Sequence, residues 1–595
     1  MQLKKCCNNK IDQKFLLQSQ KYFLRTEFFL LSTYYTKMEN YEIADKFKLL
    51  SQLMELHNEN SFKIRSYQNA SFKIDKMNDV KLMECDLPTL EQMDGIGKSV
   101  ASKIAELQQT GTINEIEKLQ AVTPQGVLHM MKIKGIGPKK VAVLWKELEV
   151  ETLGELLYAC NENRLIELKG FGDKTQTQIK KALEFTISNA GKFHYAALEK
   201  TAMTLVDTLK NSGCCSQASL TGAIRRKCEI LDCIEVIVAT DNVEKLISFL
   251  QSAGIAHKTE RNNNDLTFTI AENIKSILYL ANDDDFVWQL FYTTASIAHK
   301  EQLETIITRE QMAGKKYLSE KEIYLVYNLS YIEPEMREGI GEIKLARQNA
   351  LPHLVSLANL KGILHNHSTY SDGIHTLEQM ATNCRDLGYT YFGICDHSKS
   401  AFYANGMQPD RVLQQQKEID LLNKKLAPFH IFKGIESDIL SDGNLDYDDE
   451  ILKTFDFVVA SVHSNLKMDE DKATARLLRA IENPYTRILG HPTGRLLLAR
   501  EGYPIDHKKI IDACAANNVA IELNAHPYRL DLDWRHIAYA VSKGVMISIN
   551  PDAHSKDGFH DLYYGVCVAR KGGLQAEQTL NALDVIAIKK FFKRL

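Results

Sequence analysis

The strongest constraint on the fold lies in residues 360–595, where short apolar segments alternate with stretches of helical periodicity. This alternation is typical of a β/α repeat architecture. In a β/α barrel the carboxyl ends of the strands converge on one face, where the active site lies. Every apolar segment here ends in His, Asp, Glu or Asn: KGILHNHS, YTYFGICDHS, HIFKGIESDI, FDFVVASVHS, TRILGHPT, VAIELNAH and VMISINPDAH. Independent strands would not all be expected to end in metal-binding residue types, so we expect these side chains to gather at one end of a barrel.

The spacing within these segments also suits a metal centre. His365 and His367 are two residues apart, so an extended strand would point both imidazoles the same way, and Asp552 and His554 repeat this spacing. Imidazole and carboxylate without thiolate suit zinc, manganese or iron. A single residue of this kind would more often be a core or capping residue, but nine at successive strand ends favour ligands. The candidate ligands are His365, His367, Asp372, His397, Glu436, His463, His491, Asp552 and His554.

The segment HNHSTYSDG, with CDHS, GIESDI, SVHS, GHPT and NPDAH after it, resembles the PHP (polymerase and histidinol phosphatase) domain over residues 360–595. The resemblance implies a distorted (β/α)7 barrel with a trinuclear metal site. Adjacent metal ions would clamp the oxygens of a phosphodiester and lower the pKa of a bound water. Arg529 matches a basic position of the family that can hold a phosphate, although an ordinary salt bridge would also explain it. By position, the resemblance implies a first metal held by His365, His367, Glu436 and Asp552, a second by Glu436, His463 and His491, and a third by Asp372, His397 and His554.

Residues 38–190 have helical periodicity, and a short turn with two glycines recurs in them. The turns Gly95-Ile96-Gly97 and Gly135-Ile136-Gly137 stand between helical segments, as in a helix-hairpin-helix, and Gly170-Phe171-Gly172 is a third, weaker copy. Glycines let the backbone amides of such a turn approach a phosphate at a helix N-terminus. One turn alone would more often be a plain helix connection, but two good copies favour binding of the DNA backbone. The candidate DNA-binding residues are Gly95, Gly97, Lys98, Gly135, Gly137, Lys139, Lys140, Gly170 and Gly172.

The order of these parts resembles the bacterial family X DNA polymerases (PolX), in which a polymerase-β-like core precedes a PHP domain. ENSFKIRSYQNASFKI is similar to the N-terminal helical domain of that core. Lys103 lies where lyase-active relatives have a Schiff-base lysine, but a solvated helix lysine is the simpler interpretation. The resemblance implies a multidomain α+β and α/β protein, with an N-terminal helical DNA-binding domain at 38–120, a fingers-like region with the second and third turns at 121–194, a palm and thumb-like region at 195–340, a linker at 341–359 and the PHP domain at 360–595.

The expected polymerase centre departs from the family pattern. GAIRRKCEILDCIEVIV resembles the segment with GS, two arginines and two aspartates separated by one residue, and it keeps Arg225 and Arg226 as candidate nucleotide-binding residues. The two aspartate positions hold Cys233 and Glu235, while Asp265 fits the third. A neutral thiol cannot bridge two magnesium ions as a carboxylate does, so we expect polymerase activity to be weak or absent. Magnesium is expected at the palm only if activity persists, with Glu235 and Asp265 as catalytic residues. Two further departures are Ala223, in place of the serine, and Ala295, in place of a glycine in TTASIAH.

Composition limits the possibilities less. The formal net charge of −3 is uninformative, because an acidic metal site and a basic DNA-binding end can cancel. The 12 cysteines include no CxxC pair, which argues against a zinc ribbon and favours reduced thiols in a cytoplasm. No apolar run is long enough to cross a bilayer. We also expect the protein to be a monomer. Charged residues interrupt the apolar N-terminal region, so we expect no signal peptide, an extension at residues 1–37 outside the fold, and synthesis from Met38.

The sequence therefore predicts a DNA-repair enzyme that hydrolyses DNA phosphodiesters at a zinc or manganese centre. A 3′-to-5′ exonuclease is the leading hypothesis, and action at abasic sites or 3′ ends is compatible with it. The expected partner is gapped, nicked or 3′-ended DNA. Three alternatives stay open: a gap-filling polymerase with a PHP nuclease, a phosphatase of small phosphomonoesters, and a DNA-binding scaffold without activity, which the complete ligand set disfavours.

Overall fold

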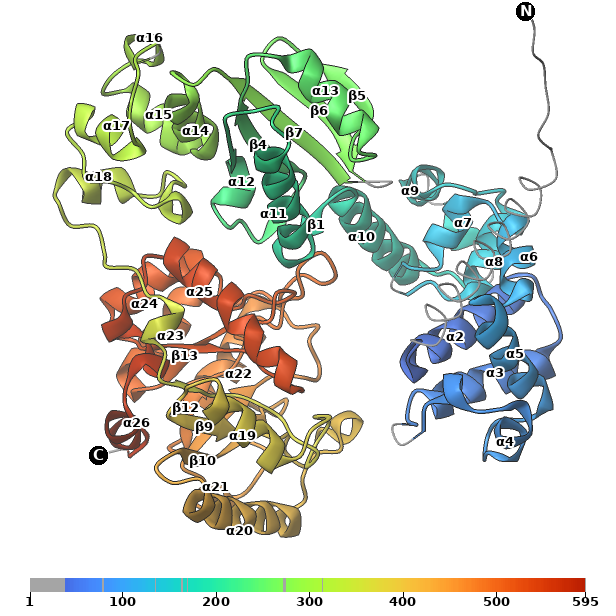
Figure 1. Ribbon diagram of the computed structural model, residues 1–595. Helices are drawn as coiled ribbons and strands as arrows, with labels where there is room; N and C mark the ends of the chain where they lie inside the picture. Colours follow the sequence, from blue (N-terminus) through green and yellow to red (C-terminus); the bar gives the residue numbers. More distant parts are fainter. Residues whose placement is uncertain are drawn as a thin grey trace, which may run out of the picture. The chain divides into compact units, whose positions relative to one another are not determined.

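The computed structural model describes residues 38–593, except for 78–79, 134, 162–163, 169, 271–273 and 313. The expected N-terminal extension at residues 1–37 lies outside the described residues. The chain divides after Ala190 into two compact units, whose elements are labelled in Figure 1. None of the described helices combines the length and the apolar character that crossing a membrane requires.

The first unit is built of helices, as its sequence periodicity predicts. Its amphipathic helices turn their apolar sides inward, so that Phe47, Leu50 and Ile104 are fully buried in one core. The helices are α2 (Asn40–Leu56), α3 (Ser61–Ile74), α4 (Leu87–Gln92), α5 (Lys98–Thr110), α6 (Asn114–Ala121), α7 (Gln125–Met130), α8 (Pro138–Glu147), α9 (Leu153–Asn161) and α10 (Asp173–Asn189).

The three glycine turns of this unit share one backbone geometry. The first glycine of each turn has a positive φ, 85° at Gly95, 94° at Gly135 and 89° at Gly170, which residues with a Cβ rarely adopt. The second glycine of each turn is extended and caps the N-terminus of α5, α8 or α10. The apolar residue between the two glycines is buried in every copy. The third turn, which its sequence marked as weaker, is therefore a structural equivalent of the first two.

The second unit begins with a mixed five-stranded sheet in the order β2-β4-β7-β6-β5. Strands β4 and β7 run parallel, and the other neighbouring pairs are antiparallel. Leu205, Val236 and Leu246 belong to one buried cluster, so helices α11 and α13 pack on the sheet. The elements are β1 (Phe193–His194), α11 (Tyr195–Asn211), β2 (Gln217–Leu220), α12 (Gly222–Arg225), β3 (Ile230–Leu231), β4 (Ile234–Ala239), α13 (Val243–Ser252), β5 (His257–Arg261), β6 (Asp265–Ile270) and β7 (Ile274–Ala281).

A helical lobe follows the sheet and surrounds the side chain of Arg337, which is fully buried. The guanidinium of Arg337 forms an ion pair with Glu320 and donates a hydrogen bond to the carbonyl oxygen of Ile332. This pairing satisfies a charge that would otherwise be costly to bury. The helices are α14 (Phe286–Thr294), α15 (Ile297–Glu304), α16 (Arg309–Met312), α17 (Glu320–Val326) and α18 (Glu342–Arg347).

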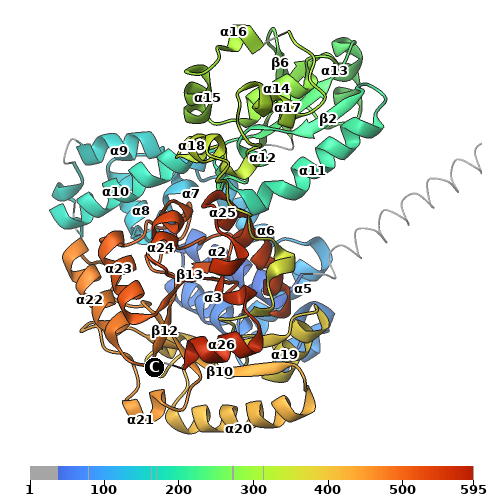
Figure 2. The ribbon, with the colours of Figure 1, turned by 90° about the vertical axis from the view of Figure 1, so that its left-hand side faces the viewer.

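The last part of the second unit is a seven-stranded parallel sheet whose strands follow in chain order from β8 to β14. A parallel bridge between Asn366 and Ala553 joins its two edges, so the sheet closes into a nearly complete barrel. Helices lie outside the strands in Figure 2. The predicted (β/α)7 barrel is therefore confirmed. The elements are β8 (Gly362–Ile363), α19 (Leu377–Asp386), β9 (Tyr391–Ile394), α20 (Pro409–Lys425), β10 (His430–Asp438), α21 (Asp449–Leu452), β11 (Phe457–Ser461), α22 (Glu470–Glu482), β12 (Thr486–Leu489), α23 (His507–Asn517), β13 (Ala520–Asn524), α24 (Ile537–Ser542), β14 (Ile547–Asn550), α25 (Leu562–Lys571) and α26 (Val585–Phe592).

The two ends of the barrel differ. At the amino ends of the strands, Phe592 of α26 stacks on Phe457 with the ring centroids 4.6 Å apart and lies edge-on to Phe432. These rings belong to an apolar cluster inside the barrel. The amino end is therefore filled by side chains, and the polar residues lie at the carboxyl end.

Candidate metal centre

The nine candidate ligands all lie at the carboxyl ends of the barrel strands, as the sequence pattern predicts. Because neighbouring parallel strands end at the same edge of the sheet, residues far apart in the chain come within contact distance. Their positions are His365 and His367 after β8, Asp372 in the following loop, His397 after β9, Glu436 near the end of β10, His463 after β11, His491 after β12, and Asp552 and His554 after β14.

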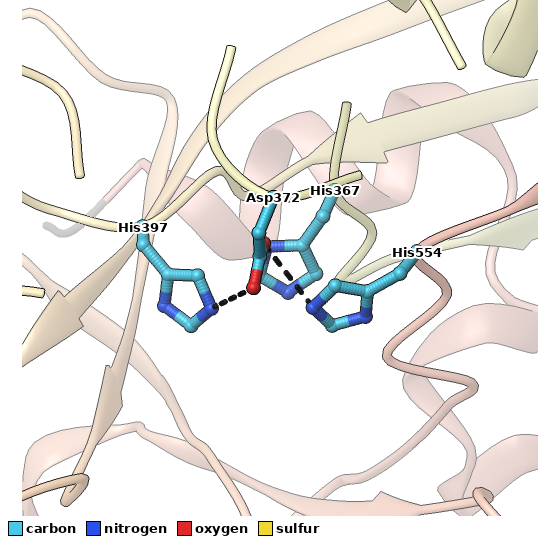
Figure 3. Close-up of side chains that lie close together, drawn as sticks. All are labelled: His367, Asp372, His397 and His554. Atoms are coloured by element: carbon cyan, nitrogen blue, oxygen red, sulfur yellow. Dashed lines mark ion pairs between the residues drawn. The ribbon is translucent and has the colours of Figure 1, made fainter. Parts of the chain in front are cut away.

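The ligand atoms form three groups, within each of which they lie no more than 4.8 Å apart. The first group has the composition that the PHP resemblance implies for the first metal. The second group contains His397 in place of the implied His491, and the third group contains His367 in addition to the implied residues. The groups are His365, His367, Glu436 and Asp552; His397, Glu436 and His463; and His367, Asp372, His397 and His554, the last drawn in Figure 3. His491 stands outside them, but its Nε2 lies 3.1 Å from Glu436 Oε1.

Glu436 lies at the centre of the cluster. Its carboxylate oxygens lie 3.0 Å from Nδ1 of His397, 3.1 Å from Nε2 of His491 and 3.2 Å from Nε2 of His463. Nε2 of His365 approaches the same carboxylate at 3.3 Å. A buried carboxylate that faces imidazoles from four strand ends is suited to bridge adjacent cations.

The backbone that presents these ligands departs from the extended geometry expected for the two pairs spaced two residues apart. Strand β8 ends at Ile363, before His365, and His365 has a φ of 59°. Strand β14 ends at Asn550, and Asp552 has a φ of 54°. Non-glycine residues in this left-handed region are uncommon and gather at functional sites. Strand alternation therefore does not orient the pairs, although His365 and His367 still reach the same site, with ring centroids 5.4 Å apart.

Three buried residues that the sequence analysis did not single out hold the ligands in place. Oε2 of Glu522 lies 2.6 Å from Nδ1 of His365, and Oδ1 of Asp438 lies 2.6 Å from Nδ1 of His463. Asn524 donates a hydrogen bond to Asp552. Carboxylates of this kind fix the ring orientation and the tautomer of a metal-binding histidine. The available signal was polar Glu522 and Asn524 alternating inside the apolar segment VAIELNAH.

Electrostatics keep His367 and Glu436 in the protonation state that binds a cation. Burial and the neighbouring His554 and His397 lower the pKa of His367 to about 3, so its imidazole is neutral near pH 7. Burial alone would raise the pKa of Glu436, but the charges of His463 and His365 hold it well below its usual value. The carboxylate is therefore ionised.

The site also contains buried polar atoms that need a partner. Nε2 of His365, Nδ1 of His367 and Oε2 of Glu436 are buried and make no hydrogen bond of good geometry, although Glu436 lies 3.3 Å from the first and His397 lies 3.0 Å from the last. Buried polar atoms are nearly always hydrogen-bonded or bound to a metal, because burial without a partner is costly. Imidazole nitrogens and carboxylate oxygens that face one another without thiolate suit zinc or manganese. The residues present therefore fit a metal-dependent site.

The predicted phosphate-binding residue Arg529 lies at the same end of the barrel. It follows β13 in the chain, and its Nε lies 4.0 Å from Oδ2 of Asp552. Arg529 therefore forms a salt bridge with a candidate metal ligand, and the same position would also allow a contact with a phosphate at the site.

The glycine turns of the first unit present an open backbone surface. A Cβ built on the turn glycines would meet no atom within 4 Å, except at Gly95, where the Lys73 side chain lies. Packing therefore does not require glycine at these positions. The positive φ of the first glycine in each turn does favour glycine there. Lys98 is exposed, Lys139 makes one ion pair 3.7 Å long, and the Lys140 ammonium lies over the Phe171 ring. The glycines without a close neighbour are Gly97, Gly135, Gly137, Gly170 and Gly172.

The residues expected at the polymerase centre lie in and around the five-stranded sheet, where Glu235 and Asp265 accept hydrogen bonds from protein groups. Within the described residues, all three groups of metal-ligand atoms lie in the barrel. Burial and the carboxylate of Glu235 raise the pKa of Cys233 to about 12, so the thiol is neutral near pH 7. Oε2 of Glu235 accepts a hydrogen bond of 2.8 Å from the backbone N–H of Ala223, and Oε1 accepts one from Tyr279. Asp265 accepts a hydrogen bond from Asn262.

The two candidate nucleotide-binding arginines are both paired with carboxylates. Arg225 donates two hydrogen bonds to the carboxylate of Glu320. Nε of Arg226 lies 3.0 Å from Oε1 of Glu338, and the guanidinium also donates a hydrogen bond to the carbonyl oxygen of Thr294. Binding of a nucleotide phosphate at these arginines would have to displace or share these acidic partners.

Lys103 is held by two acidic neighbours. Its Nζ lies 3.1 Å from Glu106 and 3.3 Å from Glu115. Although burial favours the neutral amine, these carboxylates raise the pKa of Lys103 above its usual value. A Schiff-base nucleophile requires a neutral amine, so this environment favours a structural role for the lysine.

Comparison with family models agrees with the fold and the site. A helix-hairpin-helix domain model matches residues 38–113, a SAM-like helix-hairpin-helix tandem matches residues 127–184, and the PHP domain matches residues 364–526. Fold and site thus define a metal-dependent enzyme of the PHP class, with helix-hairpin-helix domains that imply DNA binding.

Comparison with curated relatives extends this to the whole chain. The chain is 34% identical over 573 residues to the DNA polymerase/3'-5' exonuclease PolX of Bacillus subtilis (strain 168), which covers 94% of this chain and 100% of that protein. The chain belongs to the PolX family. A second relative, a "Probable phosphatase" of Thermoanaerobacter sp. (strain X514), is 30% identical over 185 residues, or 29% of this chain and 73% of that protein.

Proposed function

We propose that this protein hydrolyses DNA phosphodiesters at the barrel metal centre, as a 3′-to-5′ exonuclease in DNA repair. The observation that supports this most is the convergence of four imidazoles on Glu436, in a chain that also carries three glycine turns. The Bacillus subtilis relative is named as a DNA polymerase and 3'-5' exonuclease. Removal of nucleotides at abasic sites or blocked 3′ ends is compatible with the same chemistry.

The proposed ligands are the nine residues of the barrel mouth, and the proposed cations are zinc or manganese. Within this centre Glu436 would hold the cations together with the histidines of different strands that lie close to it. The full set is His365, His367, Asp372, His397, Glu436, His463, His491, Asp552 and His554.

The protein residues bind and orient, and no side chain needs to attack the phosphorus. When bound, the metal ions supply Lewis acidity toward the phosphate oxygens and toward water. Glu522 holds the His365 ring with Nε2 turned toward Glu436. Arg529 places a guanidinium beside Asp552, where it can neutralise a phosphate oxygen. Because α26 fills the amino end of the barrel, substrate reaches the site from the carboxyl end.

DNA polymerase activity is proposed to be weak or absent. The neutral thiol of Cys233, the hydrogen bonds of Glu235 to the protein, and the pairing of Arg225 with Glu320 all support this. Glu235 and Asp265 remain the candidate catalytic residues, with magnesium as the cofactor, if synthesis occurs. A gap-filling polymerase with a PHP nuclease is the alternative that the family membership favours.

A phosphatase acting on small phosphomonoesters is the second alternative, and the similarity to probable phosphatases favours it. The glycine turns argue against it, because a small substrate needs no DNA-binding surface. We propose a cytoplasmic monomer that binds gapped, nicked or 3′-ended DNA, with domain boundaries at residues 38–120, 121–194, 195–340, 341–359 and 360–595. The division into two compact units after Ala190 supports separating the glycine-turn region from the rest.

One comparison tests these proposals. The wild type, Glu436→Ala and Asp265→Ala are assayed with manganese on recessed, gapped and abasic DNA, with and without nucleotides. Glu436→Ala should abolish hydrolysis and Asp265→Ala should leave it unchanged. Glu577→Ala, at an exposed position, is the matched carboxylate control. Hydrolysis that survives in Glu436→Ala would contradict the assignment of the site, and nucleotide incorporation lost in Asp265→Ala would establish the polymerase alternative.

A further inference from the structure

Two aromatic side chains of the barrel are largely exposed among its described residues, Phe402 at 84% and Tyr528 at 51%. Both lie on loops that leave the carboxyl ends of strands and therefore belong to the mouth of the metal centre. Phe402 lies in the loop after β9, which is tied to the site because the N–H of Met407 donates to the carbonyl oxygen of His397. Tyr528 lies in the loop after β13, next to Arg529.

The Tyr528 ring is held in position while half of its surface stays exposed. Its ring packs against the imidazole of His194, with the centroids 4.3 Å apart. Nε2 of His194 lies 2.9 Å from the carbonyl oxygen of Leu497, and the N–H of Leu497 donates to the carbonyl oxygen of Tyr528. An aromatic ring supported from one side in this way loses little conformational freedom when a second ring stacks on it.

The charges beside Tyr528 favour a polyanion. Nε of Arg529 lies 4.0 Å from Oδ2 of Asp552, which is itself a proposed metal ligand. Arg500 lies in the loop whose Leu497 N–H donates to the carbonyl oxygen of Tyr528; it donates to the carbonyl oxygen of Gly494 and makes no ion pair within the described part of the chain. Two guanidinium groups near each other without a dedicated acidic partner are suited to bind phosphate.

Exposed aromatic rings next to guanidinium groups match the chemistry of single-stranded nucleic acid. Bases stack on aromatic side chains without regard to sequence, while the phosphates are bound by basic groups. A double helix would not offer its bases to these rings, because they are stacked on one another.

We propose that Tyr528 and Phe402 are base-stacking side chains that hold a single-stranded DNA end over the metal centre, with Arg500 and Arg529 at its phosphates. This inference rests on the proposed hydrolysis of DNA and adds the residues that hold the bases and phosphates of the strand beside the centre. The four residues are positioning residues, because they orient the DNA and leave the chemistry to the centre.

A kinetic experiment compares Tyr528→Ala, Tyr528→Phe and Phe402→Ala with the wild type on two oligonucleotides. One is ordinary single-stranded DNA, and the other carries base-free tetrahydrofuran residues at its three terminal positions. Tyr528→Ala should raise KM for the ordinary strand about tenfold with little change in kcat, as expected for one lost stacking contact. KM for the base-free end should not change, and Tyr528→Phe should behave as the wild type. Leu421→Ala, at an exposed position on α20, is the control.

A binding measurement gives a second readout that does not need hydrolysis. The protein is treated with chelator and titrated into single-stranded DNA with a terminal 2-aminopurine, whose fluorescence is quenched by stacking. Quenching should occur with the wild type and decrease with Tyr528→Ala and Phe402→Ala. Equal KM changes on both oligonucleotides, or unchanged quenching in both variants, would overturn the stacking role. Wild-type protein that quenches the probe but hydrolyses no DNA would instead contradict the proposed function.

Discussion

Glu436 and Glu522 are buried carboxylates at the same end of the barrel with different partners. Glu436 faces imidazoles on several strands, whereas Glu522 contacts Nδ1 of His365, on the side of the ring away from the centre. Residue type alone does not separate these positions, because both are Glu near the end of an apolar strand. What distinguishes them is the set of neighbours that the folded barrel supplies.

The different partners lead to a prediction for Glu522→Gln. The amide can still accept a hydrogen bond from His365 but carries no charge, so the ring keeps its orientation and becomes a weaker ligand. We expect metal affinity or DNA hydrolysis to fall by about 10- to 100-fold. Metal content measured after dialysis, together with hydrolysis rates, tests this. Glu577→Gln is the control, and full metal content with unchanged activity in Glu522→Gln would contradict the assigned role.

At the scale of elements, the two glycines of each turn have different structural roles. The first glycine of each turn supplies a positive φ, and the second places the backbone N–H groups of the next helix at an open surface. An N-terminus of this kind attracts phosphate through its free N–H groups and the helix dipole. The stability and the DNA affinity of the turn should therefore respond to different substitutions.

Gly137→Val tests this separation. Gly137 has an extended φ of −82° and a Cβ there would meet no atom, so we expect the melting temperature to change little. The added side chain would keep a phosphate away from the N-terminus of α8, and the Kd for DNA should rise several-fold. Gly135→Ala should behave in the opposite way and lower stability by about 1 kcal/mol, because its φ is 94°. Unchanged DNA affinity in Gly137→Val would show that this turn does not contact DNA.

At the scale of the whole molecule, a buried charge cluster joins the five-stranded sheet region to the barrel within the second unit. Lys571 of α25 is 1% exposed and contacts the carboxylate of Glu338 and the carbonyl oxygen of Arg226. Arg226 pairs with the same carboxylate at 3.0 Å. One of the two arginines expected to bind a nucleotide is therefore part of a joint between two regions of the unit.

The joint should contribute strongly to stability. Lys571→Met leaves the Glu338–Arg226 pair intact, whereas Glu338→Gln leaves Lys571 and Arg226 without their carboxylate, and leaving buried charges unpaired in this way costs about 3–5 kcal/mol. We expect a lower melting temperature in calorimetry for both single variants, with the larger decrease in Glu338→Gln, and a partial recovery in the double variant Lys571→Met/Glu338→Gln relative to Glu338→Gln, because one of the two unpaired cations is then removed. Equal melting temperatures for the wild type and Glu338→Gln would show that the cluster adds nothing to stability.

Much of the fold and of the candidate site is readable from the sequence. The barrel is predictable because each apolar segment is short, is followed by a helical pattern, and ends in a ligand type, as in FDFVVASVHS. The glycine turns are predictable because a positive φ next to a helix start requires glycine. The local geometry at His365 is not predictable in this way, since its left-handed backbone lies beyond the end of β8, next to the bridge between Asn366 and Ala553, which are distant in sequence.

The amino-acid order alone determines the kind of elements and the chemical types at their ends, because backbone preference and hydrophobic periodicity act over a few residues. It therefore specifies a parallel β/α barrel, glycine turns, and Cys233 where a carboxylate would be needed. Which side chains meet depends on long-range packing. Only the folded chain brings Glu522 to His365 and ties Arg226 to Lys571 through Glu338. Such contacts join residues that are distant in sequence, so local patterns carry no record of them.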